Sequence, residues 1–149
     1  SGYQLVVAGE SYGSFEKYEK QIAASGCADR IHVYNRYIDD EEVPRFFSAA
    51  DLCVLPYKSA TQSGIAAISY HFDVPLVTTL AGSIGSAVSL AGTGIAVPPL
   101  DPSSVREAIG RYFDEEGVAS SCREAIVKEK ERLSWKNFCT TLVDFAASN

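Results

Sequence analysis

Residues 50–77 decide the fold of this chain and read ADLCVLPYKSATQSGIAAISYHFDVPLV. The apolar run 52–55 has the length of a strand buried on both faces, and Pro56 ends it before a polar loop over residues 57–62. An apolar helical run begins near Ser63, and a second strand-like run follows it from residue 75. The order strand, polar loop, helix, strand predicts a parallel α/β unit.

The end of this polar loop has the composition of an anion site. Thr61, Gln62, Ser63 and Gly64 precede the helical run, where the first N–H groups lack acceptors and the helix dipole is positive. Gly64 allows a ligand to approach the backbone closely. Since Ser, Thr and Gly are also preferred at any helix start, an ordinary N-capped helix is the alternative interpretation.

The same alternation of elements extends along the chain. Strand-like runs lie at residues 4–8, 31–34, 51–55, 75–78 and 94–97, and the first is of the buried type. Helices are predicted at residues 14–25, 40–49, 63–72, 83–90, 102–114, 117–132 and 135–147, with Asp101 and Ser134 as N-caps. We therefore predict an α/β domain over residues 1–149, a doubly wound parallel sheet with C-terminal helices.

Composition excludes several classes of function. The 149 residues suit one domain, and a net charge of −6 without a cluster of Lys or Arg argues against a nucleic-acid partner. No apolar run has the length of a membrane segment, so a cytoplasmic location is expected. The four cysteines form no CxxC pair, and no metal site is predicted. His32 and His71 have no acidic or cysteine partner at a useful spacing, so structural roles are expected for both.

Four blocks in order resemble the donor-binding half of the retaining GT-B glycosyltransferases of family 4 (group 1). They are residues 50–77, 75–82, 92–102 and 133–138. The resemblance implies a Rossmann-like domain that binds a nucleoside-diphosphate sugar and needs no metal or other cofactor. It also implies a glycan or lipid-linked acceptor, as in polysaccharide assembly, held by an N-terminal domain outside this chain.

By this resemblance the nucleotide-sugar site comprises Arg36, Tyr37, Thr61, Gln62, Ser63, Gly64, Ile65, Ile68 and Gly82. No catalytic residue is assigned. Two alternatives are ordinary structure: a surface loop at Arg36 and Tyr37, and a Gly-rich turn at Gly82.

The chain departs from the family where acids are usual. Ala60 and Ile68 occupy the two positions of the family's Glu-x7-Glu motif, and Ser86 stands where another Glu is usual. An Ile side chain cannot accept a hydrogen bond, so recognition of a ribose by this route is weakened or lost.

The resemblance further implies that the first strand and helix of the donor domain precede Gln4 in a longer protein, together with an Arg and a Lys that grip the diphosphate. The absence of Met from the chain fits a fragment, which alone is expected to be inactive. Two other functions stay open: a related GT-B activity such as a nucleotide-sugar epimerase, and a degenerate domain that serves as a scaffold.

Overall fold

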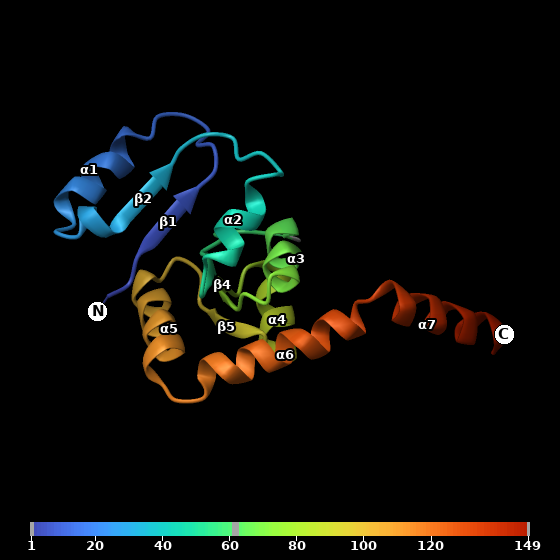
Figure 1. The fold of residues 1–149 in the computed structure, drawn as a ribbon. Helices are drawn as coiled ribbons and strands as arrows, with labels where there is room; N and C mark the ends of the chain where they lie inside the picture. Colours follow the sequence, from blue (N-terminus) through green and yellow to red (C-terminus); the bar gives the residue numbers. More distant parts are fainter. Residues whose placement is uncertain (1, 61–62, 149) are drawn as a thin grey trace. The chain divides into compact units, whose positions relative to one another are not determined.

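The computed structural model describes residues 2–60 and 63–148 (Figure 1). The chain divides into two compact units, Ser1–Phe46 and Phe47–Asn149, and helix α2 (Val43–Ser48) crosses from one to the other. Unit 1 contains β1 (Leu5–Ala8), α1 (Glu16–Ala24), the short 3-10 helix η1 (Ala28–Arg30) and β2 (Ile31–Tyr34). Its two strands are parallel, with Leu5 opposite Ile31 and Ala8 opposite Tyr34.

The prediction of a buried first strand is wrong for this chain. All four residues of β1 are exposed, with Leu5 at 48% and Val6 at 50%. The apolar sequence predicts burial on both faces, but burial also needs neighbouring elements on each face, and the described strand that pairs with β1 is β2.

Unit 2 contains the three-stranded parallel sheet β3-β4-β5, built from β3 (Cys53–Leu55), β4 (Leu76–Thr79) and β5 (Gly94–Val97). Its helices are α3 (Gly64–His71), α4 (Gly82–Ala91), α5 (Pro102–Asp114), α6 (Val118–Arg132) and α7 (Trp135–Ala147). Parallel strands alternating with helices confirm the predicted α/β class. The strands are divided between two sheets, a feature the sequence did not predict.

Strand β4 lies at the centre of unit 2, and all four of its residues are buried. Leu76 packs with Ile84 and Val88 of α4, while Val77 packs with Ala108 of α5. Because successive side chains of a strand point to opposite faces, α4 and α5 cover opposite faces of the sheet. The two apolar clusters hold β4, and hence the loops at its carboxyl end, in place.

The predicted caps of two helices are confirmed. Asp101 accepts hydrogen bonds from the N–H groups of Ser103 and Ser104 at the start of α5, where Pro102 occupies the first turn. Ser134 accepts from Asn137 N–H at the start of α7. Neither cap depends on tertiary contacts, which is why the sequence predicts both.

Candidate functional site

The candidate site is the N-terminus of α3, at the carboxyl edge of the β3-β4-β5 sheet. Ser63 has extended backbone angles and is the N-cap, and its Oγ accepts a long hydrogen bond of 3.4 Å from Ala66 N–H. The first N–H groups of a helix have no acceptor within it, and the described residues supply none for Gly64 or Ile65. The helix start predicted near Ser63 is therefore confirmed, and among the described residues the N–H groups of Gly64 and Ile65 have no acceptor.

This helix end is open to a ligand. Gly64 is exposed, and Ile65 is 41% exposed. Within residues 2–60 and 63–148, a Cβ atom placed on Gly64 would meet no atom within 4 Å, so these residues leave open space around it. An anion at this position would meet backbone N–H groups and the positive end of the helix dipole, equivalent to about half a charge.

Tyr57 fixes the loop that leads to α3. Its hydroxyl lies 3.0 Å from Ser63 Oγ, and its carbonyl oxygen accepts a 2.5 Å hydrogen bond from the Thr79 hydroxyl. Thr78 donates in the same way to the carbonyl of Leu55, at 3.1 Å. The ends of β3 and β4 are thus joined by side-chain hydroxyls. No local pattern predicts the contacts of Thr78 and Thr79, although the pair of threonines at a strand end was a usable signal.

Two of the predicted site residues cannot be placed. Thr61 and Gln62 lie outside the described residues. Ser63, Gly64 and Ile65 are brought together at the end of α3, and Ile68 follows one turn later, half-buried.

Gly82 lies on the next loop of the same sheet edge, because β4 ends at Thr79 and α4 begins at Gly82. It is exposed and has a φ of +62°, a conformation that favours glycine in a turn. Three residues later a Cβ on Gly85 would lie 2.5 Å from the Thr79 carbonyl oxygen, so the absence of a side chain lets α4 pack closely on this turn. Both glycines therefore have structural reasons to be present.

The structure also shows where the usual family acids are missing. Ala60 is half-buried and packs against the cluster of Leu55, Leu76, Ile84 and Val88. Its small apolar side chain suits that packing, whereas a carboxylate would be partly desolvated there. Ser86 is exposed on α4.

Arg36 and Tyr37 follow β2 in unit 1. Arg36 donates two hydrogen bonds of 2.7 Å to the carboxylate of Glu42 and a third to the carbonyl of Tyr37. The hydrogen bonds from Arg36 lower the pKa of Glu42 to about 2. Arg36 thus already has an anionic partner, and Tyr37 is 65% exposed. Because α3 belongs to unit 2, a role for these two residues beside it stays a prediction.

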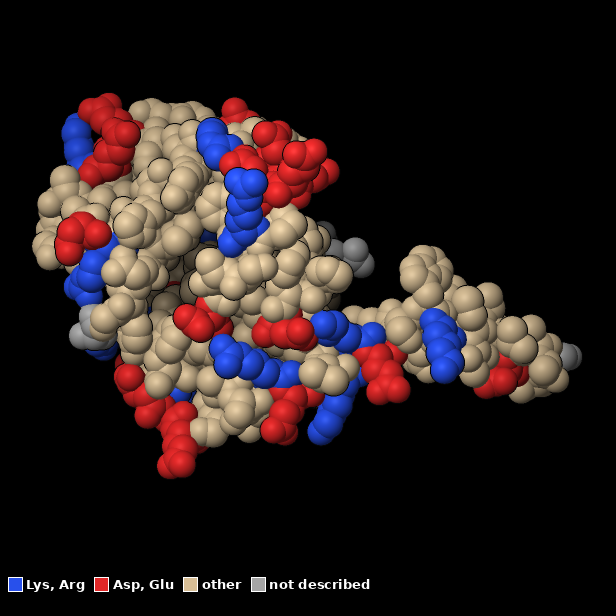
Figure 2. Space-filling view, viewed as in Figure 1, with Lys and Arg blue, Asp and Glu red and all other residues tan. Residues whose placement is uncertain are grey.

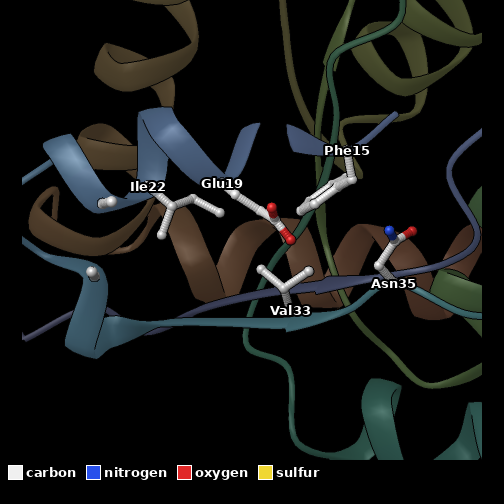
Figure 3. A pocket seen from close by; sticks show the side chains of 7 residues that line it. Phe15, Glu19, Ile22, Val33 and Asn35 are labelled. Atoms are coloured by element: carbon white, nitrogen blue, oxygen red, sulfur yellow. The ribbon is translucent and has the colours of Figure 1, made fainter. Parts of the chain in front are cut away.

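A separate hollow of about 380 Å³ lies within unit 1, between α1 and β2 (Figure 3). Figure 3 shows the Glu19 carboxylate reaching toward Val33, with Phe15 and Ile22 on either side. The lining is mainly apolar and its charged group is a carboxylate, which disfavours a phosphate ligand. This hollow is therefore not a second candidate for the diphosphate.

Charged side chains on the surface alternate in sign. Figure 2 shows Lys and Arg beside Asp and Glu along α6. Three ion pairs account for part of this pattern: Arg123 with Asp51, Lys130 with Asp73, and Arg132 with Glu129. On the face that Figure 2 shows, the described residues form no continuous basic strip of the kind that binds a phosphate backbone.

The described residues contain neither a candidate metal centre nor a candidate membrane-spanning helix. Within residues 2–60 and 63–148, no group of three His, Cys, Asp or Glu side chains is arranged to hold a metal ion. None of the described helices combines the length and the apolar character that crossing a lipid bilayer requires.

Comparison with known proteins identifies the family to which this chain belongs. The family model described as "Glycosyl transferases group 1" matches residues 2–115. The chain therefore belongs to the group 1 glycosyltransferases.

Its relatives are longer proteins. The chain is 26% identical over 141 residues to a D-inositol 3-phosphate glycosyltransferase of Acidothermus cellulolyticus, covering 92% of this chain and 31% of that protein. A second such enzyme, from Corynebacterium urealyticum, is 25% identical over 108 residues, which are 72% of this chain and 26% of the relative. The chain thus spans between a quarter and a third of the curated relatives it matches.

A solved structure shares the fold. Anabaena HepE in complex with UDP-glucose aligns with a TM-score of 0.78 at 15% identity, covering 98% of this chain and 41% of HepE. At 15% identity, this structural match shows a shared fold and nothing more. The match to the family model confirms the predicted resemblance to the group 1 family.

Proposed function

We propose that this chain is the nucleotide-sugar-binding domain of an enzyme that transfers a sugar, with retention of configuration, from a nucleoside diphosphate to an acceptor. The acceptor would be a polysaccharide or a lipid-linked glycan. The observation that carries the proposal is the N-terminus of α3, which is capped by Ser63 and begins with the exposed residues Gly64 and Ile65. The UDP-glucose bound to HepE, a protein of the same fold, supports the choice of donor.

The chemistry proposed for this end of α3 is electrostatic. As the sugar leaves, negative charge grows on the diphosphate, and oriented N–H groups stabilise it without having to reorganise. A helix N-terminus contributes about 0.3–1 kcal/mol when exposed and up to about 2 kcal/mol when partly buried. Since this is far less than catalysis needs, cationic groups supplied from outside the chain complete the site in our proposal. The scheme uses no metal ion and no other cofactor.

We further propose that an acceptor-binding domain, and a first strand and helix of this domain, belong to a longer cytoplasmic protein. The short span of the chain within its relatives supports this. So does the exposure of Leu5, Val6 and Val7, since strands of parallel sheets are normally covered. In this proposal the isolated chain binds the donor weakly and has no transferase activity.

One set of residues favours a second candidate function. Ala60, Ile68 and Ser86 replace the usual acids, and Ala60 packs toward the core. A domain that kept the fold and lost donor binding would serve as a scaffold for a partner protein.

A nucleotide titration separates the two candidates. UDP, GDP and ADP are added in turn to the ¹⁵N-labelled chain and, separately, to the full-length protein, while amide shifts are followed by NMR. Saturable shifts at Gly64 and Ile65 with one nucleotide support donor binding and identify the base. The same titration of Ser63→Ala should lose most of these shifts, because the cap and one donor are removed.

Ser120→Ala is the matched control, since Ser120 lies in the first turn of α6 and its hydroxyl bonds the backbone of Gly117. It should bind like the parent protein. If none of the three nucleotides shifts the amide signals of the full-length protein, donor binding is contradicted and the scaffold function is favoured.

A further inference from the structure

Tyr57 links the sheet to the end of α3 through three groups. Its N–H donates to the carbonyl of Leu55 at 2.9 Å, its carbonyl accepts from the Thr79 hydroxyl, and its own hydroxyl meets Ser63 Oγ at 3.0 Å. The ring is half-buried and packs against the cluster containing Leu55. The backbone and the ring of Tyr57 are therefore held independently of Ser63, so its hydroxyl can position Ser63.

The number of hydrogen bonds that Ser63 can make bears on which hydroxyl donates in its contact with Tyr57. A serine hydroxyl has one proton to donate and two lone pairs to accept. One lone pair accepts the N–H of Ala66. If Tyr57 donates to the other, both lone pairs are used and the Ser63 proton is left for a ligand.

Tyr57 is the better donor of the two hydroxyls. A phenol is more acidic than an aliphatic alcohol, so its O–H forms the stronger donor bond. Among the described residues, the Tyr57 hydroxyl has Ser63 as its hydrogen-bond partner, and the distance fits donation by either hydroxyl. The greater acidity of the phenol favours donation from Tyr57 to Ser63.

We propose that Tyr57 is a positioning residue that orients the Ser63 hydroxyl as a donor toward the diphosphate. This inference rests on the proposed function. The end of α3 then offers three donors, the N–H groups of Gly64 and Ile65 and the O–H of Ser63. Because neither lone pair of Ser63 remains free, the site selects for an anion.

The chain contains a matched control in Tyr70. Its hydroxyl lies 2.6 Å from Thr93 Oγ1, and its ring packs against the same cluster as that of Tyr57. Tyr70 lies in the last turn of α3, away from Ser63. Tyr57→Phe and Tyr70→Phe thus each delete one tyrosine hydroxyl that is hydrogen-bonded to another hydroxyl. Only the Tyr57 hydroxyl contacts the N-terminus of α3.

The test measures UDP affinity by calorimetry in the full-length protein and its variants. Tyr57→Phe should weaken binding about threefold to tenfold, a range equivalent to one hydrogen bond. Tyr70→Phe should stay within about twofold. If Tyr57 acts through Ser63, the double variant Tyr57→Phe/Ser63→Ala should bind no more weakly than Ser63→Ala alone.

A second readout needs no nucleotide. Deuterium exchange of the peptide over residues 63–69 should quicken in Tyr57→Phe and not in Tyr70→Phe, because the cap on Ala66 is loosened. Three results would each overturn the inference and leave the proposed function standing. They are unchanged exchange in Tyr57→Phe, a UDP affinity of Tyr57→Phe within twofold of the parent, and additive effects on affinity in the double variant. If the parent protein binds none of UDP, GDP and ADP, the proposed function fails, and with it the role of Tyr57 toward a ligand; if it binds GDP or ADP instead, the same variants are measured with that nucleotide.

Discussion

Gly94 of β5 lies directly against Leu76 of β4. The two residues are opposite each other in the parallel ladder, and a Cβ atom on Gly94 would stand 2.0 Å from the Leu76 carbonyl oxygen. Real Cβ contacts do not occur at this distance, and the neighbouring atoms are backbone atoms of the central strand, which cannot move aside easily. The closeness of β4 and β5 therefore depends on glycine at this position.

Gly94→Ala should lower the free energy of unfolding by about 1–3 kcal/mol, the usual cost of overpacking a well-packed core. Urea unfolding followed by circular dichroism measures it. Gly110→Ala is the control, because a Cβ there would meet only Asp114 Oδ2 at an ordinary 3.8 Å inside α5. That variant should gain about 0.5–1 kcal/mol from helix propensity. Equal stability of the two variants would contradict the close packing.

Gly64→Ala should weaken UDP binding without loss of stability. The added methyl group meets no atom of the described residues within 4 Å, so the described part of the fold accepts it, yet it lies at the helix end that we propose to bind the diphosphate. We expect affinity to fall at least fivefold, measured by calorimetry on the full-length protein. Gly110→Ala again serves as the control and should bind UDP normally. Normal binding by Gly64→Ala would place the diphosphate elsewhere.

Asp101 should make the stability depend on pH in a defined range. Hydrogen bonds from Ser103 and Ser104 lower the pKa of Asp101 from 3.8 to about 2. A lowered pKa in the folded state means that the contribution of the carboxylate is complete above about pH 4 and is lost as the pH falls toward 2. Melting temperatures between pH 6 and pH 2 test this.

Asp101→Asn should keep most of the cap at neutral pH, because an amide oxygen also accepts from the first turn of α5. Its melting temperature should fall less steeply with acid than that of the parent. Parallel curves for the two proteins would show that Asp101 does not titrate as described. Part of the slope would persist in both, since the pKa of Glu42 is also about 2.

The four cysteines should react with iodoacetamide at different rates. All four are free thiols; Cys139 is exposed, Cys27 intermediate and Cys122 buried. Burial raises the pKa of Cys53 and of Cys122, which lowers the thiolate fraction that reacts. Timed labelling with peptide mass analysis at pH 8 should therefore modify Cys139 first and Cys53 and Cys122 last. Early labelling of Cys122 would mean that α6 opens readily.

The position and type of the main elements could be predicted from sequence. The structure contains every predicted helix and strand, and residues 31–34, 94–97, 102–114 and 135–147 match their predictions at both ends. Apolar periodicity and local capping residues determine these features, and both operate over short separations along the chain.

Much less of the candidate site could be predicted. Local signals predict Ser63 and Gly64, and the family resemblance adds Ile65, but neither predicts the contact between Tyr57 and Thr79. Their hydrogen bond joins residues 22 positions apart, at the ends of neighbouring strands. Such a contact depends on the register of β3 against β4, which no local pattern specifies.

The sequence by itself determined the α/β order of elements, the helix start near Ser63 and the N-caps Asp101 and Ser134, because each depends on residues within one turn of a helix or one strand. The tertiary structure decided that Leu5 is exposed while Leu76 is wholly buried, although both lie in apolar strands. It also decided that Tyr57 reaches Ser63 from a side chain anchored on the core. Burial depends on which elements cover a strand, and that is settled by packing between distant parts of the chain.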